Sequence, residues 1–386
     1  MTPKAPRISI PPPGLPAPTF IARPAPLRRL AESLLRQPVV AVDTESNSLY
    51  AYQEQVCLIQ FSTPQADYLV DPLALDSLAP LGEVFSNPQL EKVFHAAEYD
   101  VICLRRDFGF ELQHLFDTMT AARILGRGEV GLGSLLKAEF GVSLDKRFQR
   151  ANWGQRPIPP HLLAYGQLDT HYLIALRNRL GAELKAKGLW PLALEDFQRL
   201  QGTNGRGSEN RQPDCWRISG SYDLPPQNAA VLQQLCRYRD QQARSLNRPL
   251  FKVIGDQTLL QIAIDCPASL DDLRHIQGMT AQQVARHGGG LLEAVQCGLQ
   301  SPPIHPPRQA KPSEAVLGRL ESLRNWRKET ARQMGVESDV VLPRDLLYIL
   351  ADQNPGSMAE LAAIMKDLPW RREHFGEQIL GVLSDG

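Results

Sequence analysis

The C-terminal part of the chain matches itself when it is shifted by 88 residues without a gap. The stretch "LCRYRDQQARSL" (235–246) falls on "LRNWRKETARQM" (323–334), and the apolar positions of both stretches have helical spacing. Further matches pair Ala263 with Ala351, Pro267 with Pro355, Leu273 with Leu361, Ile276 with Ile364 and Gly288 with Gly376. The shared Pro and Gly positions argue against a chance likeness of two amphipathic stretches. We therefore predict two copies of one small helical domain.

Three segments rich in Pro or Gly divide the chain. Residues 1–26 contain nine prolines, which can neither pair regularly in a sheet nor continue a helix, so we expect a mobile arm there. The polar stretch 201–214 and the Pro-rich stretch 301–312 are typical of connections between domains. The expected domains are a mixed helix and strand domain at 27–205 and helical domains at 214–300 and 313–386, with a Pro-rich linker at 301–312 between the helical domains.

Charge and composition exclude some classes of protein. Lys+Arg and Asp+Glu both number 42, so the net charge is zero and any nucleic-acid surface must be local. The longest apolar runs fall far short of the ~20 residues that span a bilayer, and the N-terminus has no apolar core like that of a signal peptide. The six cysteines form no C-x-x-C pair, which suits a reducing cytosol. We expect a cytoplasmic protein with no membrane segment.

Residues 27–205 mix two kinds of pattern. Short runs rich in Val, Ile and Phe predict strands, and longer stretches with helical spacing predict helices. The predicted strands are 39–46, 55–63, 67–72 and 92–97, and the predicted helices include about 99–108 and 159–180. Short polar connections between the first three strands favour antiparallel neighbours. The fold class of this domain is therefore α/β.

Two carboxylates stand at the end of the first predicted strand. In "VVAVDTES" (39–46), an apolar run leads into Asp43 and Glu45, whose i, i+2 spacing puts both side chains on one face. An ionised carboxylate is costly in a buried place unless something pairs with it. The nearest basic residue, Arg36, precedes the strand. Either the two acids lie in water at the strand end, or a cation that the local sequence does not supply neutralises them.

Two later stretches carry acids at positions that are ordinary when taken one at a time. "VFHAAEYDVICLRR" (93–106) places Asp100 in the first turn of a helix, where an acid complements the helix dipole. "AYGQLDTHY" (164–172) places Tyr165 and Asp169 at i and i+4 on one helix face. A core tyrosine beside a surface aspartate would give the same pattern. The three acidic stretches therefore indicate a functional site only when they are considered together.

In chain order, a strand D-x-E, a helix-borne Asp and a helical Y-x-x-x-D resemble the DEDD superfamily of 3′→5′ exonucleases, in its DEDDy branch. The stretches "FHAAEYDVICL", "FDTMTAARILG" and "AYGQLDTHYL" resemble the ribonuclease D family, and the repeated module resembles the HRDC domains that follow the nuclease in that family. The resemblance covers about residues 25–386. It implies a ribonuclease H-like fold with a mixed five-stranded sheet and flanking helices, followed by two all-α HRDC-like domains.

The resemblance also implies a chemistry. Carboxylate oxygens suit Mg²⁺ or Mn²⁺, and two such ions roughly 3.5–4 Å apart can hold the attacking and leaving oxygens of a phosphoryl displacement. By resemblance, Asp43, Glu45, Asp100 and Asp169 would hold two divalent ions, and Tyr165 would position the attacking water. The substrate would be RNA with a free 3′ end, such as a transfer RNA precursor, and the products would be nucleoside 5′-monophosphates.

Basic residues gather in the helix that opens each repeated module. The candidate phosphate contacts are Arg237 and Arg239 in the first module and Arg324, Arg327 and Lys328 in the second. Solvated helix faces with i, i+4 ion pairs explain the same residues equally well. Tyr238 and Trp326 have the spacing of core positions, so we interpret them as packing residues.

Two other functions fit parts of this pattern. A DNA 3′→5′ exonuclease would carry the same acids, because four carboxylates cannot distinguish RNA from DNA. A catalytically silent RNA-binding protein could keep the fold, although such a protein would be expected to lose one or more of the acids. No G-x-x-x-x-G-K-[ST] phosphate loop occurs, which argues against an ATP-driven helicase. We expect a monomeric, metal-dependent 3′→5′ exoribonuclease.

Overall fold

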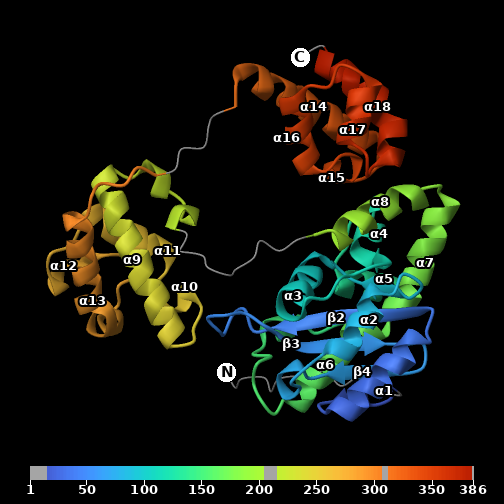
Figure 1. The fold of residues 1–386 in the computed structure, drawn as a ribbon, viewed down its shortest axis with the longest axis horizontal. Helices are drawn as coiled ribbons and strands as arrows, with labels where there is room; N and C mark the ends of the chain where they lie inside the picture. Colours follow the sequence, from blue (N-terminus) through green and yellow to red (C-terminus); the bar gives the residue numbers. More distant parts are fainter. Residues whose placement is uncertain (1–14, 204–214, 307–311, 385–386) are drawn as a thin grey trace, which may run out of the picture. The chain divides into compact units, whose positions relative to one another are not determined.

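The structure is a computed structural model that describes residues 15–203, 215–306 and 312–384. The chain forms two units, which are described separately below. The first unit combines the α/β domain with the second copy of the repeated module, and the second unit combines the first copy with residues 47–55. Figure 1 shows the sheet of the first unit and the helical modules. The two predicted copies of a helical module are therefore present.

A mixed sheet organises the α/β domain. Its strands are β1 (Thr19–Ile21), β2 (Val39–Ser46), β3 (Val56–Ser62), β4 (Asp67–Val70), β5 (Glu91–Phe94) and β6 (Leu115–Asp117). Their order across the sheet is β1-β4-β3-β2-β5-β6. The β2–β3 and β3–β4 pairs are antiparallel, as the short connections predicted, whereas β1–β4, β2–β5 and β5–β6 are parallel. The predicted mixed sheet is confirmed, and β2 lies inside it with partners on both sides.

The sheet has six strands rather than the expected five, because part of the expected mobile arm belongs to the fold. Thr19–Ile21 pairs with β4, and the N–H of Asp71 donates to the carbonyl of Ile21 at 2.8 Å. Helix α1 then begins at Pro24, where a proline at the first helical positions costs no hydrogen bond. The prediction of a mobile arm is therefore wrong for residues 15–26, and residues 1–14 lie outside the described part of the chain.

Within residues 15–203, eight helices flank this sheet. They are α1 (Pro24–Leu35), α2 (Ala79–Ser86), α3 (Glu98–Phe108), α4 (Thr118–Ile124), α5 (Leu132–Phe140), α6 (Pro160–His171), α7 (Leu173–Ala186) and α8 (Trp190–Gln201), with 3₁₀ turns at Pro72–Ala74 and Lys146–Arg150. The predicted helix near 99–108 corresponds to α3. The single helix predicted over 159–180 is instead two helices, which meet at Tyr172.

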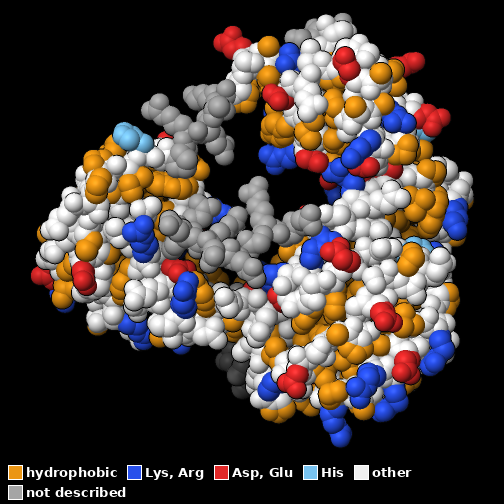
Figure 2. All heavy atoms as spheres, viewed as in Figure 1, with side chains coloured by type: hydrophobic (Ala, Val, Ile, Leu, Met, Phe, Trp, Pro, Cys, Tyr) orange, Lys and Arg blue, Asp and Glu red, His pale blue; other side chains and the backbone are white. Residues whose placement is uncertain are grey.

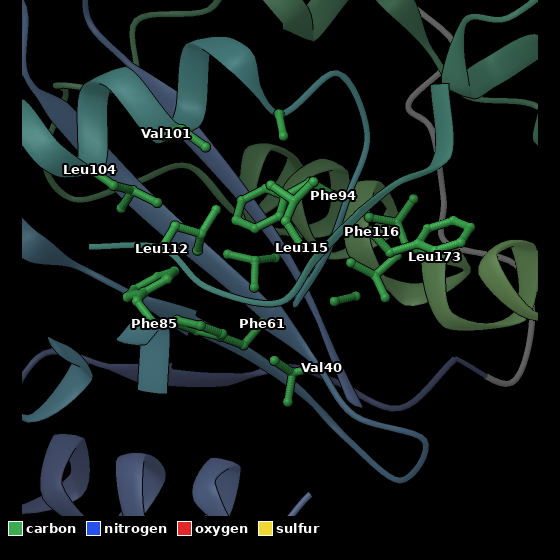
Figure 3. Close-up of a cluster of buried hydrophobic side chains, with 14 of the residues drawn as sticks. Val40, Phe61, Phe85, Phe94, Val101, Leu104, Leu112, Leu115, Phe116 and Leu173 are labelled. Atoms are coloured by element: carbon green, nitrogen blue, oxygen red, sulfur yellow. The ribbon is translucent and has the colours of Figure 1, made fainter. Parts of the chain in front are cut away.

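The sheet is covered by apolar side chains on both of its faces. The larger cluster packs strand residues such as Val40, Phe61 and Phe94 against residues of α3 such as Val101 and Leu104 (Figure 3). A smaller cluster packs Cys57, Leu58 and Leu69 against Tyr165 of α6 and the preceding segment. Burial on both faces explains the nearly unbroken apolar runs of β2 and β3. It also means that polar groups at the end of β2 are shielded from both directions.

The two helical modules have matching elements. The first contains α9 (Pro226–Ser245), α10 (Leu250–Val253), α11 (Asp256–Asp265), α12 (Leu270–His275) and α13 (Ala281–Gln300); the second contains α14 (Glu314–Met334), α15 (Ser338–Val341), α16 (Arg344–Gln353), α17 (Met358–Ile364) and α18 (Pro369–Ser384). Every helix of the second copy begins 88 residues after its counterpart. The first module is preceded by 3₁₀ turns at Cys215–Arg217 and Ser221–Asp223.

Contacts inside the modules repeat with the same spacing. The rings of Tyr238 and His287 lie edge to face at 6.1 Å, and those of Trp326 and Phe375, each 88 residues later, lie at 5.9 Å. The interpretation of Tyr238 and Trp326 as packing residues is therefore confirmed. Among the residues that the structure describes, no helix is long and apolar enough to cross a membrane.

Candidate active site

Strand β2 carries the first two acids into the interior of the sheet. Asp43 lies opposite Gln60 and Glu45 opposite Leu58 in the antiparallel pairing with β3. Cross-strand partners project to the same face, so both carboxylates lie on the face that packs against α6. The pairing register shifts just after Glu45, where the ladder becomes irregular.

Helix α6 approaches that face closely because it carries a glycine at the contact. A Cβ on Gly166 would lie 3.2 Å from the Gln60 side chain and 3.2 Å from the Leu58 side chain, which is tighter than ordinary packing. Glycine allows such close approach of a backbone. The neighbouring Tyr165 and, one turn later, Asp169 are thereby brought to the acids of β2.

Three carboxylates converge at this place. Oxygen atoms of Asp43, Glu45 and Asp169 all lie within 4.8 Å of one another. They line a cavity with a volume of about 400 Å³. The sequence prediction that these residues meet, although more than 120 positions separate β2 from Asp169, agrees with this geometry.

The acids raise one another's pKa. Burial raises the pKa of Asp43, Glu45 and Asp169 well above the usual carboxyl range, and the neighbouring carboxylates raise those of Asp43 and Glu45 further. Like charges in a shielded place disfavour the ionised forms unless a cation is present. The three clustered groups are all carboxylates, and hard carboxylate oxygens are the donors that Mg²⁺ and Mn²⁺ prefer, so these residues fit a divalent cation.

Asp100 reaches the site from the other side of the sheet, on α3. Its side chain is 6% exposed, and its Oδ1 accepts a hydrogen bond from the hydroxyl of Thr44 at 2.5 Å. Burial raises the pKa of Asp100 to about 7, against the lowering effect of this hydrogen bond. Asp100 also raises the pKa of Asp43 by its charge, which places the two carboxyls in the same electrostatic environment. It is not one of the three carboxylates whose oxygens lie within 4.8 Å.

Tyr165 is held in a fixed position by its ring and by its hydroxyl. The ring packs between Phe148, at 5.8 Å, and Trp153, at 6.2 Å. The hydroxyl interacts with the side chains of Gln149 and Asp169. Burial, followed by the charges of the nearby acids, raises the pKa of Tyr165 above its usual value. A phenol that is harder to ionise keeps its proton, so its hydroxyl can still donate a hydrogen bond while little phenolate forms to act as a base.

His95 also lines the cavity, and sequence reasoning did not single it out. Its Nδ1 lies 2.9 Å from the hydroxyl of Thr118, and that hydroxyl donates to the carbonyl of Phe94 at 2.9 Å. A hydroxyl has one proton, so Nδ1 is the protonated nitrogen and Nε2 carries the lone pair. Burial lowers the pKa of His95, which keeps the ring neutral. The only sequence signal for His95 is its position at the end of a predicted buried strand, in the stretch "FHAAEYD".

The remaining lining residues are Thr44, which lies between the two acids of β2, and members of two segments that follow later in the chain. They are Thr44 on β2, Gly131, Leu132, Gly133 and Ser134 at the start of α5, and Leu144 and Gln149 in the segment before α6. Apart from Thr44, whose hydroxyl donates to Asp100, and Gln149, which contacts Tyr165, these residues supply shape and backbone groups, and their sequence carries no pattern that marks them as part of a site.

Two of the predicted phosphate contacts, Arg239 and Arg327, are hydrogen-bonded within their own modules. Arg239 is only 6% exposed, and it donates to the carbonyl of Ile254 at 3.1 Å and to Asp256 at 2.6 Å. Arg327, its counterpart in the second copy, donates to the carbonyl of Leu342 at 2.9 Å, and burial lowers its pKa. Each guanidinium therefore fixes the connection between two helices of its own module. The burial of Arg239 speaks against a phosphate contact there, whereas Arg327 is half-buried and its phosphate contact stays a prediction.

The other three candidates lie on the surface. Arg237, Arg324 and Lys328 are exposed, and Arg324 donates to the hydroxyl of Tyr348 at 2.9 Å. They do not lie at equivalent places in the two modules, since Arg237 corresponds to Asn325. On the faces visible in Figure 2, the described Lys and Arg side chains are interspersed with Asp and Glu. No structural feature tests these three residues as phosphate contacts, so they stay predictions.

Comparisons with known proteins agree with the site. Residues 18–185 match the family model described as a 3'-5' exonuclease, and residues 228–295 and 316–383 each match the HRDC domain model. A ribonuclease D from Pseudomonas paraeruginosa is 31% identical over 359 residues, which cover 90% of this chain and 93% of that protein. A ribonuclease D from Gluconacetobacter diazotrophicus is 30% identical over 395 residues, which cover 97% and 94% of the two chains.

A solved structure matches over a similar length. The crystal structure of Escherichia coli RNase D, an exoribonuclease involved in structured RNA processing, is 25% identical in sequence with a TM-score of 0.71. The match covers 95% of this chain and 99% of that one. The likeness therefore extends from the α/β domain through both helical modules.

Proposed function

This chain belongs to the ribonuclease D family of 3′→5′ exoribonucleases, and we propose that it shortens structured RNA precursors, such as transfer RNA precursors, from the 3′ end. The observation that carries the proposal is the convergence of Asp43, Glu45 and Asp169, whose oxygens lie within 4.8 Å of one another. The products are nucleoside 5′-monophosphates. We further propose that the enzyme acts as a monomer in the cytoplasm.

The acids have separate tasks in this proposal. Asp43, Glu45 and Asp169 would hold one Mg²⁺ or Mn²⁺, and Asp100 together with Asp43 would hold a second ion. When bound, the ions supply a water of lowered pKa and neutralise charge on the phosphate that is cleaved. The raised pKa of Asp43 and Glu45 supports these roles, because each carboxyl is stabilised in its ionised form only when positive charge is added.

Tyr165 orients the attacking water in this proposal and takes no proton from it. Its ring is fixed between Phe148 and Trp153, so the hydroxyl can direct a hydrogen bond without losing further side-chain freedom. The raised pKa of Tyr165 keeps the phenol protonated over the pH range in which RNA is stable. Holding a water in line with the phosphate is a contribution that geometry alone can make.

The exposed basic residues Arg237, Arg324 and Lys328 are proposed to contact phosphates upstream of the 3′ end. Each such contact would release counterions, so binding would weaken as salt rises. The mixed charges on the visible faces (Figure 2) suit a few local contacts better than a broad basic surface.

A degradation assay tests the proposed function. RNA labelled at its 5′ end is incubated with wild type, with Asp43→Asn and with Asp76→Asn, in Mg²⁺, in Mn²⁺ and in EDTA. Asp76 is exposed on the same domain, so its variant controls for the loss of one negative charge. Wild type and Asp76→Asn should give a ladder that shortens from the 3′ end and disappears in EDTA. Asp43→Asn should give no ladder.

The same assay separates the alternatives. A labelled DNA of the same sequence that is shortened faster than the RNA would favour a DNA exonuclease. Binding of RNA without any shortening, in either metal, would favour a silent RNA-binding protein. A hairpin RNA with a 3′ tail that is trimmed no better than an unstructured RNA would contradict the proposed preference for structured precursors.

A further inference from the structure

Thr44 lies between the two acids of β2, but its side chain projects to the other side of the strand. Successive side chains of a strand alternate between faces, so Asp43 and Glu45 face α6 while Thr44 faces α3. The Thr44 hydroxyl donates to Oδ1 of Asp100 at 2.5 Å. One tripeptide therefore carries two acids toward α6 and a hydrogen-bond donor toward the acid of α3.

The start of α3 is held in place without help from Thr44. The N–H of Ala97 donates to Oδ2 of Asp117 at 2.7 Å, and the same carboxylate accepts from the N–H of Thr120 at 2.6 Å. A second contact joins the hydroxyls of Tyr99 and Ser46 at 3.3 Å. Since these groups anchor the backbone around Asp100, the Thr44 hydroxyl acts on the Asp100 carboxylate more than on the position of the helix. That carboxylate also accepts hydrogen bonds from the backbone N–H groups of Thr44 and of Asp100 itself, and the Thr44 hydroxyl is its side-chain donor.

That rotation has consequences for ligand geometry. The terminal torsion of an aspartate is broad, so each hydrogen bond that a carboxylate accepts narrows the range of its orientations. Thr44 is β-branched and has a restricted χ1, which aims its hydroxyl in one direction. In metal sites, loss of a group that orients a ligand from outside the coordination sphere typically costs roughly 10- to 100-fold in metal affinity.

We propose that Thr44 is a positioning residue, whose hydroxyl holds the Asp100 carboxylate in the orientation that a second divalent cation, shared with Asp43, requires. The inference rests on the proposed function of the same site. The proposed role differs from a purely structural role of the hydroxyl. It predicts a change in the affinity for one of two bound ions and no change in the stability of the fold as a whole.

A metal-binding titration tests the inference without turnover. Free Mn²⁺ is followed by electron paramagnetic resonance as Mn²⁺ is added to the full-length protein, in the presence of saturating adenosine 5′-monophosphate. Thr44→Val replaces the hydroxyl with a methyl group of similar size, and Thr44→Ser keeps the hydroxyl. Wild type and Thr44→Ser should bind two Mn²⁺. Thr44→Val should keep the tighter ion and bind the weaker one roughly 10- to 100-fold less tightly, as Asp100→Asn should.

Three results would overturn the inference. These are a Thr44→Val protein that binds both ions like wild type, a Thr44→Ser protein as weak as Thr44→Val, and a wild type that binds only one ion. Thr44→Ala, which removes the hydroxyl without adding volume, replaces Thr44→Val if the valine disturbs folding. Failure of the proposed function would look different: wild type would leave RNA intact while the Mn²⁺ titrations of the variants still differed.

Discussion

Arg371 of α18 and Glu195 of α8 form a buried ion pair, in which Nη1 lies 2.9 Å from Oε2 and the two side chains are 0% and 4% exposed. Arg371 also donates to the carbonyl of Val340 at 2.8 Å and to Asp196 at 2.9 Å. The counterpart of Arg371 in the first module is Gln283. The second module is therefore joined to the α/β domain by charges that the first module lacks.

Replacing this arginine should destabilise the first unit. Arg371→Gln, the residue found in the first module, leaves the Glu195 carboxylate buried without its cation, and burial already raises the pKa of that carboxyl. Loss of one partner of a buried pair costs about 3–5 kcal/mol. Chemical denaturation of the full chain measures the effect, with the exposed substitution Lys366→Gln as control. Equal stability of the two variants would contradict the prediction.

Lys92 should make stability depend on pH. It is fully buried in β5, its Nζ donates to the carbonyl of Asn87 at 2.7 Å, and burial lowers its pKa to about 7. Between pH 7 and an ordinary lysine pKa of about 10.4, the unfolded chain binds a proton that the folded chain does not. The free energy of unfolding therefore rises with pH in this window.

The comparison with Lys92→Met isolates this effect. The methionine protein should have its largest stability advantage over wild type below pH 7, and the advantage should shrink as pH rises toward 10. Denaturation curves at several pH values measure it. A difference between the two proteins that stays constant from pH 6 to pH 10 would show that Lys92 keeps its proton in the folded chain.

Ala96 adopts a left-handed backbone conformation, with φ of 62°, beside the cavity residue His95. This conformation costs an L-residue roughly 1–2 kcal/mol in the folded state. Alanine offsets only part of this cost, because the unfolded chain has less conformational entropy with alanine than with glycine. Ala96→Gly should therefore raise the free energy of unfolding by about 1 kcal/mol. The reverse change, Gly109→Ala at a φ of 68° with open space around it, should lower it by a similar amount. Thermal unfolding of the two variants should move in opposite directions.

Tyr165→Phe tests whether the Tyr165 hydroxyl orients the attacking water or ionises and acts as a base. The ring still packs between Phe148 and Trp153, so stability should change little, while the rate of RNA shortening should fall by about 100-fold because the water loses its alignment. Since burial raises the pKa of Tyr165, the pH dependence of the remaining rate should keep the wild-type shape. If the pH–rate profile of wild type has a neutral or alkaline titration step that the profile of Tyr165→Phe lacks, the tyrosine acts as a base.

Much of this architecture could be predicted from spacing. The shift of 88 residues predicted the helical modules, because shared Pro, Gly and apolar positions fix where helices begin, end and pack. The order of Asp43, Asp100 and Asp169 predicted a common site through its resemblance to the DEDD exonucleases, because periodicity gave each acid a face but did not bring the faces together. In both cases the signal is local or repeats along the chain.

Other features depend on contacts between distant residues and left no such signal. Thr44 bonds Asp100 across 56 positions, and no pattern within either stretch pairs them. Arg239 and Arg327 were assigned to the surface from residue type, although their recurrence in both copies was itself a sign of packing. Thr19–Ile21 joins the sheet despite the prolines around it, because an edge strand needs hydrogen bonds on one side only.

The central claim is that divalent cations are the partners of the clustered carboxylates, and calorimetric unfolding of wild type and Asp43→Asn with and without Mn²⁺ tests it most directly. In EDTA, Asp43→Asn should be at least as stable as wild type, since it removes one of several mutually repelling acids. With Mn²⁺ at about 100 times its dissociation constant, wild type should gain about 2.7 kcal/mol, and the variant should gain much less. A wild type that Mn²⁺ does not stabilise, or an equal gain in both proteins, would contradict the account.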